Sequence, residues 1–277
     1  MEIKITTLSE NTANIGFIGE WGLSILIEAD GLRILFDTGA SFTAVYNAQL
    51  LGIDFSSVDK IVLSHGHWDH TGGLVNVLRR RGEGVDIIGH PDIWAAKYTQ
   101  GEKYGERYIG IPFNREQLEG LGAHFLLTKE PVWITDNIVT SGEIPMVTEY
   151  EDIDSYLYVK ENGVFKPDPL ADDLAIAINT ELGLIIILGC CHRGIINTIH
   201  HFREITRQNQ VNCVIGGTHL MDASPERLAK TVTDLKQFGV QRLGASHCTG
   251  FEASSRMAQE FPDMFFLNNA GTRLSLP

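Results

Sequence analysis

Residues 65–73 read His65-Gly66-His67-Trp68-Asp69-His70-Thr71-Gly72-Gly73 and follow a short apolar run, residues 61–63. In an extended segment, side chains two residues apart point the same way, so His65 and His67 can hold one metal ion through their ring nitrogens. Asp69 and His70 lie across the following turn and can reach a second ion. The glycines allow the backbone to fold tightly enough for both pairs to meet. This stretch therefore predicts a metal-binding loop at the end of a strand.

Other apolar runs also end in a polar side chain next to a glycine. The segments are Phe36-Asp37-Thr38-Gly39, Ile88-Gly89-His90, Leu188-Gly189-Cys190-Cys191-His192, Gly217-Thr218-His219 and Ala245-Ser246-His247-Cys248. In α/β folds, ligands bind at the carboxyl ends of strands, where side chains project from rigid backbone. We therefore expect these polar residues to converge on one edge of the fold.

Apolar periodicity predicts alternating strands and helices along most of the chain. We expect strands at residues 22–28, 33–36, 61–63, 85–88, 132–135, 138–140, 156–159, 164–166, 174–179, 184–188, 211–215, 241–243 and 264–267. We expect helices at residues 74–81, 91–98, 114–121, 194–208, 225–238 and 253–260. Hairpins followed by strand–helix units favour an α/β fold with sheets covered by helices on their outer faces.

No linker or change in composition divides the sequence, so a single domain over residues 1–277 is the simplest organisation. The part from residue 101 to residue 150 is harder to assign than the rest of the chain. We expect a substrate-facing insertion within it.

The composition excludes several classes of protein. The chain has 277 residues, of which 43% are hydrophobic, and 22 Lys+Arg against 35 Asp+Glu give a net charge of −13. Such a charge disfavours nucleic acid as a partner, because phosphates bind to cationic surfaces. The longest apolar run, residues 184–188, is far shorter than the ~20 residues that span a bilayer. With no signal pattern at the N-terminus and no disulfide framework among four cysteines, we expect a cytoplasmic protein with no membrane partner.

The segment from His65 to His70 resembles the His-x-His-x-Asp-His signature of the metallo-β-lactamase superfamily. Residues 36–39 resemble the first motif of that superfamily, in which the aspartate, here Asp37, orients the metal loop. Together with residues 188–194, 216–220 and 246–250, these motifs look like the branch named for dihydropterin-ribofuranosylaminobenzene phosphate synthase. The resemblance implies an αββα sandwich of the metallo-β-lactamase type, with two mixed sheets, helices on the outer faces and a dinuclear metal site.

The same resemblance implies the ligands of each ion. His65 and His67 match the ligands of one metal, and Asp69 and His70 match those of the other. His247 matches the last ligand of the superfamily and would join the second ion.

The chain departs from the superfamily pattern at two ligand positions. No His stands in a Gly-His-Thr context before the late strand, and Cys190 stands where an aspartate usually follows. We take His192 as the candidate for the missing ligand, the alternative being a side chain that supports the ligands or faces substrate. Cys190 and His90 can be metal ligands or supporting groups, or a packed thiol and an ordinary strand-end residue.

A pair of divalent ions can generate hydroxide near neutral pH, with Asp69 as the catalytic residue that holds it and accepts its proton. Zinc is the expected ion, with manganese and iron as alternatives. Arg193 and His219 are candidates for binding a small, anionic substrate.

Three functions remain open at this point. The first is a hydrolase of a small ester, lactone or phosphoester. The second is a synthase that joins a dihydropterin pyrophosphate to an aminobenzene ribofuranosyl phosphate and releases pyrophosphate, as the resemblance implies. The third is a metal-dependent ligand sensor. The oligomeric state is open too, a homo-oligomer included.

Overall fold

The computed structural model describes residues 2–277, which divide into two compact units. The N-terminal unit comprises Glu2–Lys129, Ile153–Asp172 and Asn269–Pro277, and the C-terminal unit comprises Glu130–Asp152 and Asp173–Asn268. Residues 101–150, the expected insertion, are shared between the two units. That insertion and the single domain over residues 1–277 stay predictions.

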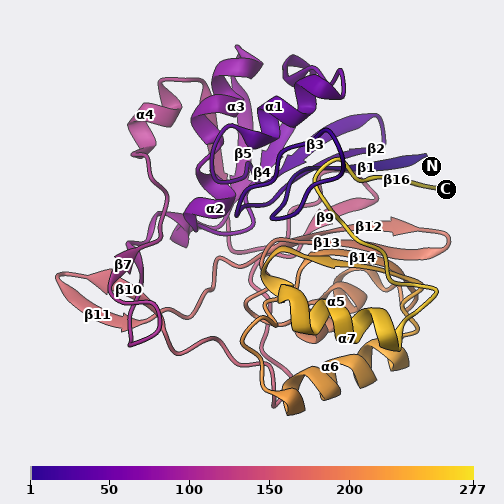
Figure 1. Cartoon of the computed structure of the whole chain (residues 1–277). Coiled ribbons are helices and arrows are strands. Elements are labelled where there is room, and N and C mark those ends of the chain that lie inside the picture. Colours follow the sequence, from indigo (N-terminus) through magenta and orange to yellow (C-terminus); the bar gives the residue numbers. More distant parts are fainter. Residues whose placement is uncertain (1) are drawn as a thin grey trace. The chain divides into compact units, whose positions relative to one another are not determined.

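A seven-stranded mixed sheet forms the main part of the N-terminal unit (Figure 1). Its strands, in spatial order, are β16 (Arg273–Leu276), β1 (Ile3–Ser9), β2 (Ser24–Ala29), β3 (Leu32–Phe36), β4 (Lys60–Val62), β5 (Val85–Gly89) and β8 (Ala123–Leu127). The neighbours from β16 to β3 are antiparallel, and those from β3 to β8 are parallel. The carboxyl ends of β3, β4 and β5 therefore meet at one edge of this sheet.

Helices α1 (Thr43–Leu50), α3 (Leu74–Arg81) and α4 (Arg115–Glu119) pack into the core of this unit. The amphipathic pattern of α3 explains its position: Leu74, Val75, Val77 and Leu78 are buried with side chains of the parallel strands. Gly82 then ends the helix in the left-handed conformation, with φ 83°. This helix and its end agree with the sequence prediction.

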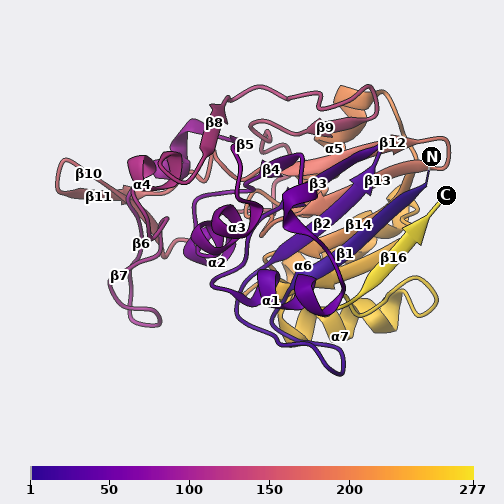
Figure 2. The same cartoon turned by 90° about the horizontal axis from the view of Figure 1, so that it is seen from above.

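A smaller, four-stranded antiparallel sheet also belongs to the N-terminal unit (Figure 2). Its order is β11 (Val164–Pro167), β10 (Leu157–Glu161), β6 (Lys97–Thr99) and β7 (Arg107–Tyr108). The helix predicted over residues 91–98 is wrong. Pro91–Trp94 forms a single 3₁₀ turn, Ala95 leaves it with ψ 143°, and the chain continues as β6 paired with β10.

The C-terminal unit contains a five-stranded sheet. Its order is β15 (Arg242–Ser246), β14 (Val211–Gly217), β13 (Gly183–Leu188), β12 (Ala175–Thr180) and β9 (Ile138–Thr140). Strands β13, β14 and β15 are parallel, and helices α5 (Ile195–Thr206) and α6 (Pro225–Phe238) make the crossovers between them. Every residue of β13 is buried, which agrees with its continuous apolar sequence.

Helices α5, α6 and α7 (Gly250–Glu260) bury their apolar faces in the core of the C-terminal unit. Two predicted strands do not form. Residues 264–267 make only an isolated bridge, from Phe265 to Leu243, and residues 132–135 make only the bridge from Trp133 to Val139. Met264 and Phe265 pack against the core of the C-terminal unit without adding a strand to its sheet.

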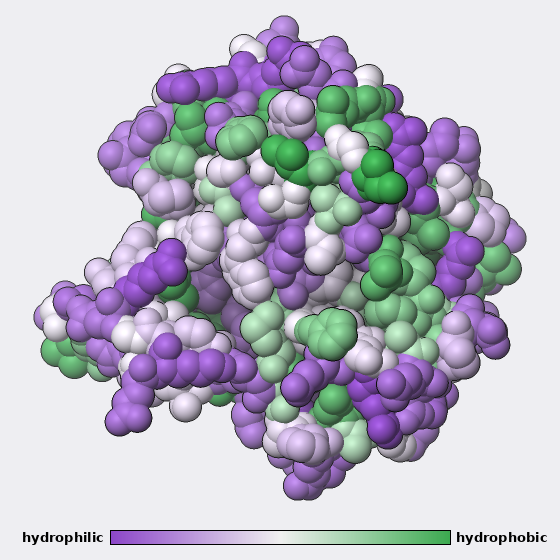
Figure 3. Space-filling view, viewed as in Figure 1, coloured by the Kyte–Doolittle hydropathy of each residue, from purple (hydrophilic) through white to green (hydrophobic). Residues whose placement is uncertain are grey.

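Hydrophilic and hydrophobic side chains are interspersed on the face shown in Figure 3. Within residues 2–277, no helix combines the length and the hydrophobicity that crossing a membrane requires.

Replacing Phe202 with alanine should test the C-terminal core, because its ring is fully buried on α5. We expect the Phe202→Ala substitution to lower the free energy of unfolding by about 3–5 kcal/mol, measured by urea denaturation. Phe251 on α7 is 87% exposed, so Phe251→Ala is the matched control and should change it by less than about 0.5 kcal/mol. Similar losses in both variants would contradict this packing.

Candidate metal centre

Two histidines of the metal loop face each other in the N-terminal unit. His65 and His67 follow β4 and are buried, and their Nε2 and Nδ1 atoms lie 2.9 Å apart. Two nitrogens bound to one ion at about 2.0–2.1 Å lie roughly 3 Å apart. The pair therefore fits the shared coordination of a single divalent ion.

A second pair of donors comes from the short helix α2 (Trp68–Thr71), directly after these histidines. Asp69 and His70 are both buried, and Asp69 Oδ2 lies 3.9 Å from His70 Nε2. A carboxylate oxygen and an imidazole nitrogen at this separation also fit one ion. Each half of the His-x-His-x-Asp-His motif thus presents two donors.

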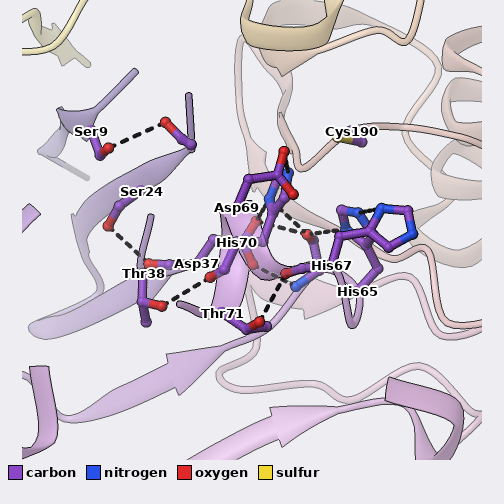
Figure 4. Close-up of polar contacts among 12 residues, drawn as sticks. Ser9, Ser24, Asp37, Thr38, His65, His67, Asp69, His70, Thr71 and Cys190 are labelled. Carbon is purple, nitrogen blue, oxygen red and sulfur yellow. Dashed lines mark hydrogen bonds and ion pairs between the residues drawn. The ribbon is translucent and has the colours of Figure 1, made fainter. Parts of the chain in front are cut away.

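The carboxylate of Asp37 organises both pairs (Figure 4). It is fully buried after β3, and its oxygens accept the backbone amide and the hydroxyl of Ser64, each at 2.7 Å. Its Oδ2 also lies 2.6 Å from Nδ1 of His70, and the Ser64 hydroxyl lies 2.9 Å from Nδ1 of His65. A Nδ1–H bonded in this way leaves Nε2 as the ligand atom. Asp37 therefore acts on two candidate metal ligands through their other ring nitrogens, directly on His70 and through Ser64 on His65.

Glycines bring the segment after β3 against the metal loop. A Cβ on Gly73 would lie 2.0 Å from the carbonyl oxygen of Thr38, so only glycine fits there. Thr38 in turn donates from its amide and its hydroxyl to the carbonyl of His70, at 2.8 and 2.9 Å. The two motifs, distant in sequence, are thus held together by backbone contacts.

The C-terminal unit presents its own cluster of donors at the carboxyl ends of its parallel strands. Cys190 follows β13, His219 follows β14 and His247 follows β15. Ligand atoms of Cys190, His219 and Cys248 all lie within 4.8 Å of one another. The ring of His192 lies 4.0 Å from that of His219, measured between centroids. Thiol and imidazole groups together suit zinc and softer ions.

Residues of both units have unusual backbone conformations beside these donors. Asp37, Cys191, His219 and His247 have φ of 58°, 61°, 49° and 53°. Left-handed conformations are uncommon for residues other than glycine and concentrate at functional sites. No sequence pattern indicated these four conformations.

The thiols of Cys191 and Cys213 are unreactive. Burial raises the pKa of the Cys191 thiol well above its usual value, and burial raises that of Cys213 to about 12. Both stay protonated near neutral pH. They fit the role of small buried hydrophobic residues.

His90 lies at the end of β5, as expected, and is fully buried. Its Nδ1 accepts the amide of Asp92 at 3.0 Å and so caps the following 3₁₀ turn. This contact gives His90 a structural role at that nitrogen.

Arg193 precedes α5, but the first amides of that helix already have a partner. The buried carboxylate of Glu151 accepts the amides of Ile196 and Asn197, at 2.9 and 2.8 Å. Arg193 itself donates through Nε to the carbonyl of Ile144. Any contribution of Arg193 to anion binding therefore comes from its charge, because Glu151 occupies the helix N-terminus.

The fold and these donor sets define the class of protein. A family model described as the metallo-beta-lactamase superfamily matches residues 22–156. The chain belongs to the metallo-β-lactamase superfamily, in the branch of the synthase described next.

Three relatives make the comparison specific. The chain is 37% identical to 7,8-dihydropterin-6-methyl-4-(β-D-ribofuranosyl)-aminobenzene-5'-phosphate synthase of Methanocaldococcus jannaschii, over 97% of this chain and 95% of that protein. It is 34% identical to the uncharacterized protein MJ0448 of the same organism, over 92% and 94% of the two chains. The crystal structure of Tm1679, a metal-dependent hydrolase of the β-lactamase superfamily, matches with a TM-score of 0.86, 28% identity and 99% of both chains. The predicted fold class and the prediction of an enzyme are confirmed.

The Asp37→Asn substitution should weaken metal binding. An amide cannot accept from Ser64 and His70 as a carboxylate does, so the ligand rings lose their orientation. We expect metal affinity to fall by a factor on the order of 10–100, measured by competition with a chelator. Asp263 is exposed, and Asp263→Asn should leave the affinity unchanged. Unchanged affinity in Asp37→Asn would show that this network does not support the ligands.

Proposed function

We propose that this chain is a metal-dependent synthase that joins a dihydropterin methyl diphosphate to an aminobenzene ribofuranosyl phosphate and releases pyrophosphate. The observation that carries the proposal is the 37% identity to a synthase of this kind over nearly the whole of both chains. A match of that extent covers every segment that contributes a candidate ligand, whereas a shared fold alone supports many chemistries.

The proposed metal ligands are those that the motifs indicate. They are His65, His67, Asp69 and His70 of the N-terminal unit and His192 and His247 of the C-terminal unit. We propose two divalent ions, with zinc expected and manganese and iron as alternatives. When bound, such ions supply positive charge that stabilises a departing diphosphate.

The bonds that form and break in the proposed reaction indicate which side chain must accept a proton. A bond forms between the methylene carbon of the pterin and the amine nitrogen of the aminobenzene, and the bond from that carbon to the diphosphate oxygen breaks. The diphosphate leaves with the electron pair, and the amine nitrogen loses a proton. We assign Asp69 as the group that accepts this proton. Its carboxylate lies beside His70 at the start of the short helix α2.

Both proposed substrates are anions, whereas the chain carries a net charge of −13. Local positive charge must therefore overcome the repulsion of the whole protein. Arg193 and His219 are the proposed contacts for the phosphate groups, Arg193 through its charge, and the bound ions would add further positive charge.

A metal-dependent hydrolase is the second candidate. Its support is the likeness to Tm1679, which is 28% identical and carries that description. In this reaction water takes the place of the amine, and Asp69 accepts a proton from water. The two candidates thus share the site and differ in the nucleophile.

The synthase proposal is tested by incubating metal-loaded protein with the pterin diphosphate, with and without the aminobenzene substrate. We expect coupled product and pyrophosphate only when both substrates are present, measured by chromatography and a pyrophosphate assay. The Asp69→Asn substitution should lower the rate by about 10²–10⁴-fold, because the proton acceptor is lost.

His124 has an exposed side chain, so His124→Ala should retain the full rate. Release of diphosphate or phosphate without the amine, and with no coupled product, would favour the hydrolase. No turnover in either case would contradict both enzymes and leave the ligand sensor.

A further inference from the structure

Two adjacent carboxylates, Asp172 and Asp173, are 0% and 1% exposed. Burying a carboxylate is costly unless hydrogen bonds compensate, so two such residues in succession need an explanation. Each accepts a backbone amide from a loop that carries proposed metal ligands.

Asp172 contacts the metal loop within the N-terminal unit. Its Oδ2 accepts the amide of Gly66 at 2.8 Å, and Gly66 stands between His65 and His67 in the sequence. The other side of Gly66 is also closed, because a Cβ there would lie 2.2 Å from the carbonyl oxygen of Ile93. The peptide that joins the two facing histidines is thus held from both sides.

Lys97 supports Asp172 from β6. Its Nζ lies 2.8 Å from Asp172 Oδ1 and 2.8 Å from Asp168 Oδ2, and all three side chains are buried. Burial lowers the pKa of Lys97, but the charges of Asp172 and Asp168 outweigh it and raise the pKa above its usual value. The ammonium stays charged, and a carboxylate bonded to it is a strong acceptor for the Gly66 amide.

Asp173 makes the corresponding contact within the C-terminal unit. Its Oδ2 accepts the amide of Arg193 at 2.9 Å, directly after His192. The next residue, Gly194, has φ 95°, and a Cβ there would lie 2.2 Å from the carboxyl carbon of Glu151. The backbone that follows His192 is therefore also fixed by a buried carboxylate.

We propose that Asp172 and Asp173 are positioning residues that fix the backbone of the two ligand loops through Gly66 and Arg193. Consecutive residues of one chain thereby set the conformation of both loops. Metal affinity then depends on carboxylates that bind no metal themselves. The proposal rests on the metal ligands proposed above.

The test compares Asp172→Asn with Asp168→Asn. An amide at residue 172 cannot accept from both Lys97 and Gly66, because its NH₂ group would face one of these donors. Asp168 also pairs with Lys97, but its second oxygen accepts the amide of Leu170, outside the metal loop. Both variants remove one buried charge beside Lys97, and only the first disturbs the loop.

We expect zinc affinity, measured by competition with a chelator, to fall on the order of 10–100-fold in Asp172→Asn and to stay near the native value in Asp168→Asn. The thermal midpoints of the two metal-free variants should be lowered alike. With cobalt in place of zinc, the visible spectrum should change in Asp172→Asn alone. Equal losses of affinity in the two variants, or no loss in Asp172→Asn, would overturn the role of Asp172.

Asp173→Ala is the second variant, and it applies also if Asp172→Asn does not fold. It removes the acceptor for the Arg193 amide, so zinc affinity should again fall, and native affinity would overturn the role of Asp173. Zinc binding by the native protein distinguishes failure of the proposed metal-based function from failure of the positioning role alone. If it binds no zinc in the same titration, the metal-based function fails. If it binds zinc and the variants match it, only the positioning role fails.

Discussion

The metal loop depends on one buried carboxylate, that of Asp37, which accepts hydrogen bonds from a backbone amide, a hydroxyl and an imidazole. Charged hydrogen bonds of this kind are strong, and in a buried setting they leave little freedom to the groups they join. Asp37 follows β3, whereas Ser64 and His70 follow β4, so the contact also joins two neighbouring strand ends. Without the Asp37 carboxylate, the imidazole rings would lose their common orientation.

The same principle recurs at other backbone groups near the proposed ligands. Asp172 holds Gly66, Asp173 holds Arg193 and Glu151 holds the first amides of α5. In each case a buried carboxylate accepts a hydrogen bond from a peptide N–H. The nearby side chains that are candidate metal ligands are thereby left to other partners. A chain with a net charge of −13 thus uses part of its acidic excess inside the fold, where it shapes the loops.

Local signals in the sequence predicted most elements well. Helix α6 begins and ends as expected because Ser224 caps it, Pro225 opens it and Gly239 closes it in the left-handed conformation. Residues 91–98 were misassigned because β6 forms through pairing with β10 and through the ion pairs of Lys97 with Asp168 and Asp172, more than 70 positions away. Contacts between residues so far apart in the sequence produce no periodic pattern of apolar residues.

The sequence likewise predicted some residues of the candidate site and missed others. The positions of residues that follow strands, such as His65, Cys190 and His247, were predictable because the carboxyl ends of parallel strands meet at one edge of each sheet. Ser64 and Asp172 were not, since they act through hydrogen bonds to partners that are distant in the sequence, Ser64 to Asp37 and Asp172 to Gly66 and Lys97. The left-handed conformations of His219 and His247 were equally hidden, because they cost energy locally and persist only where the surrounding structure fixes the chain. Sequence therefore indicates which side chains are candidate ligands, whereas the groups that orient them become apparent only once the sheets have formed.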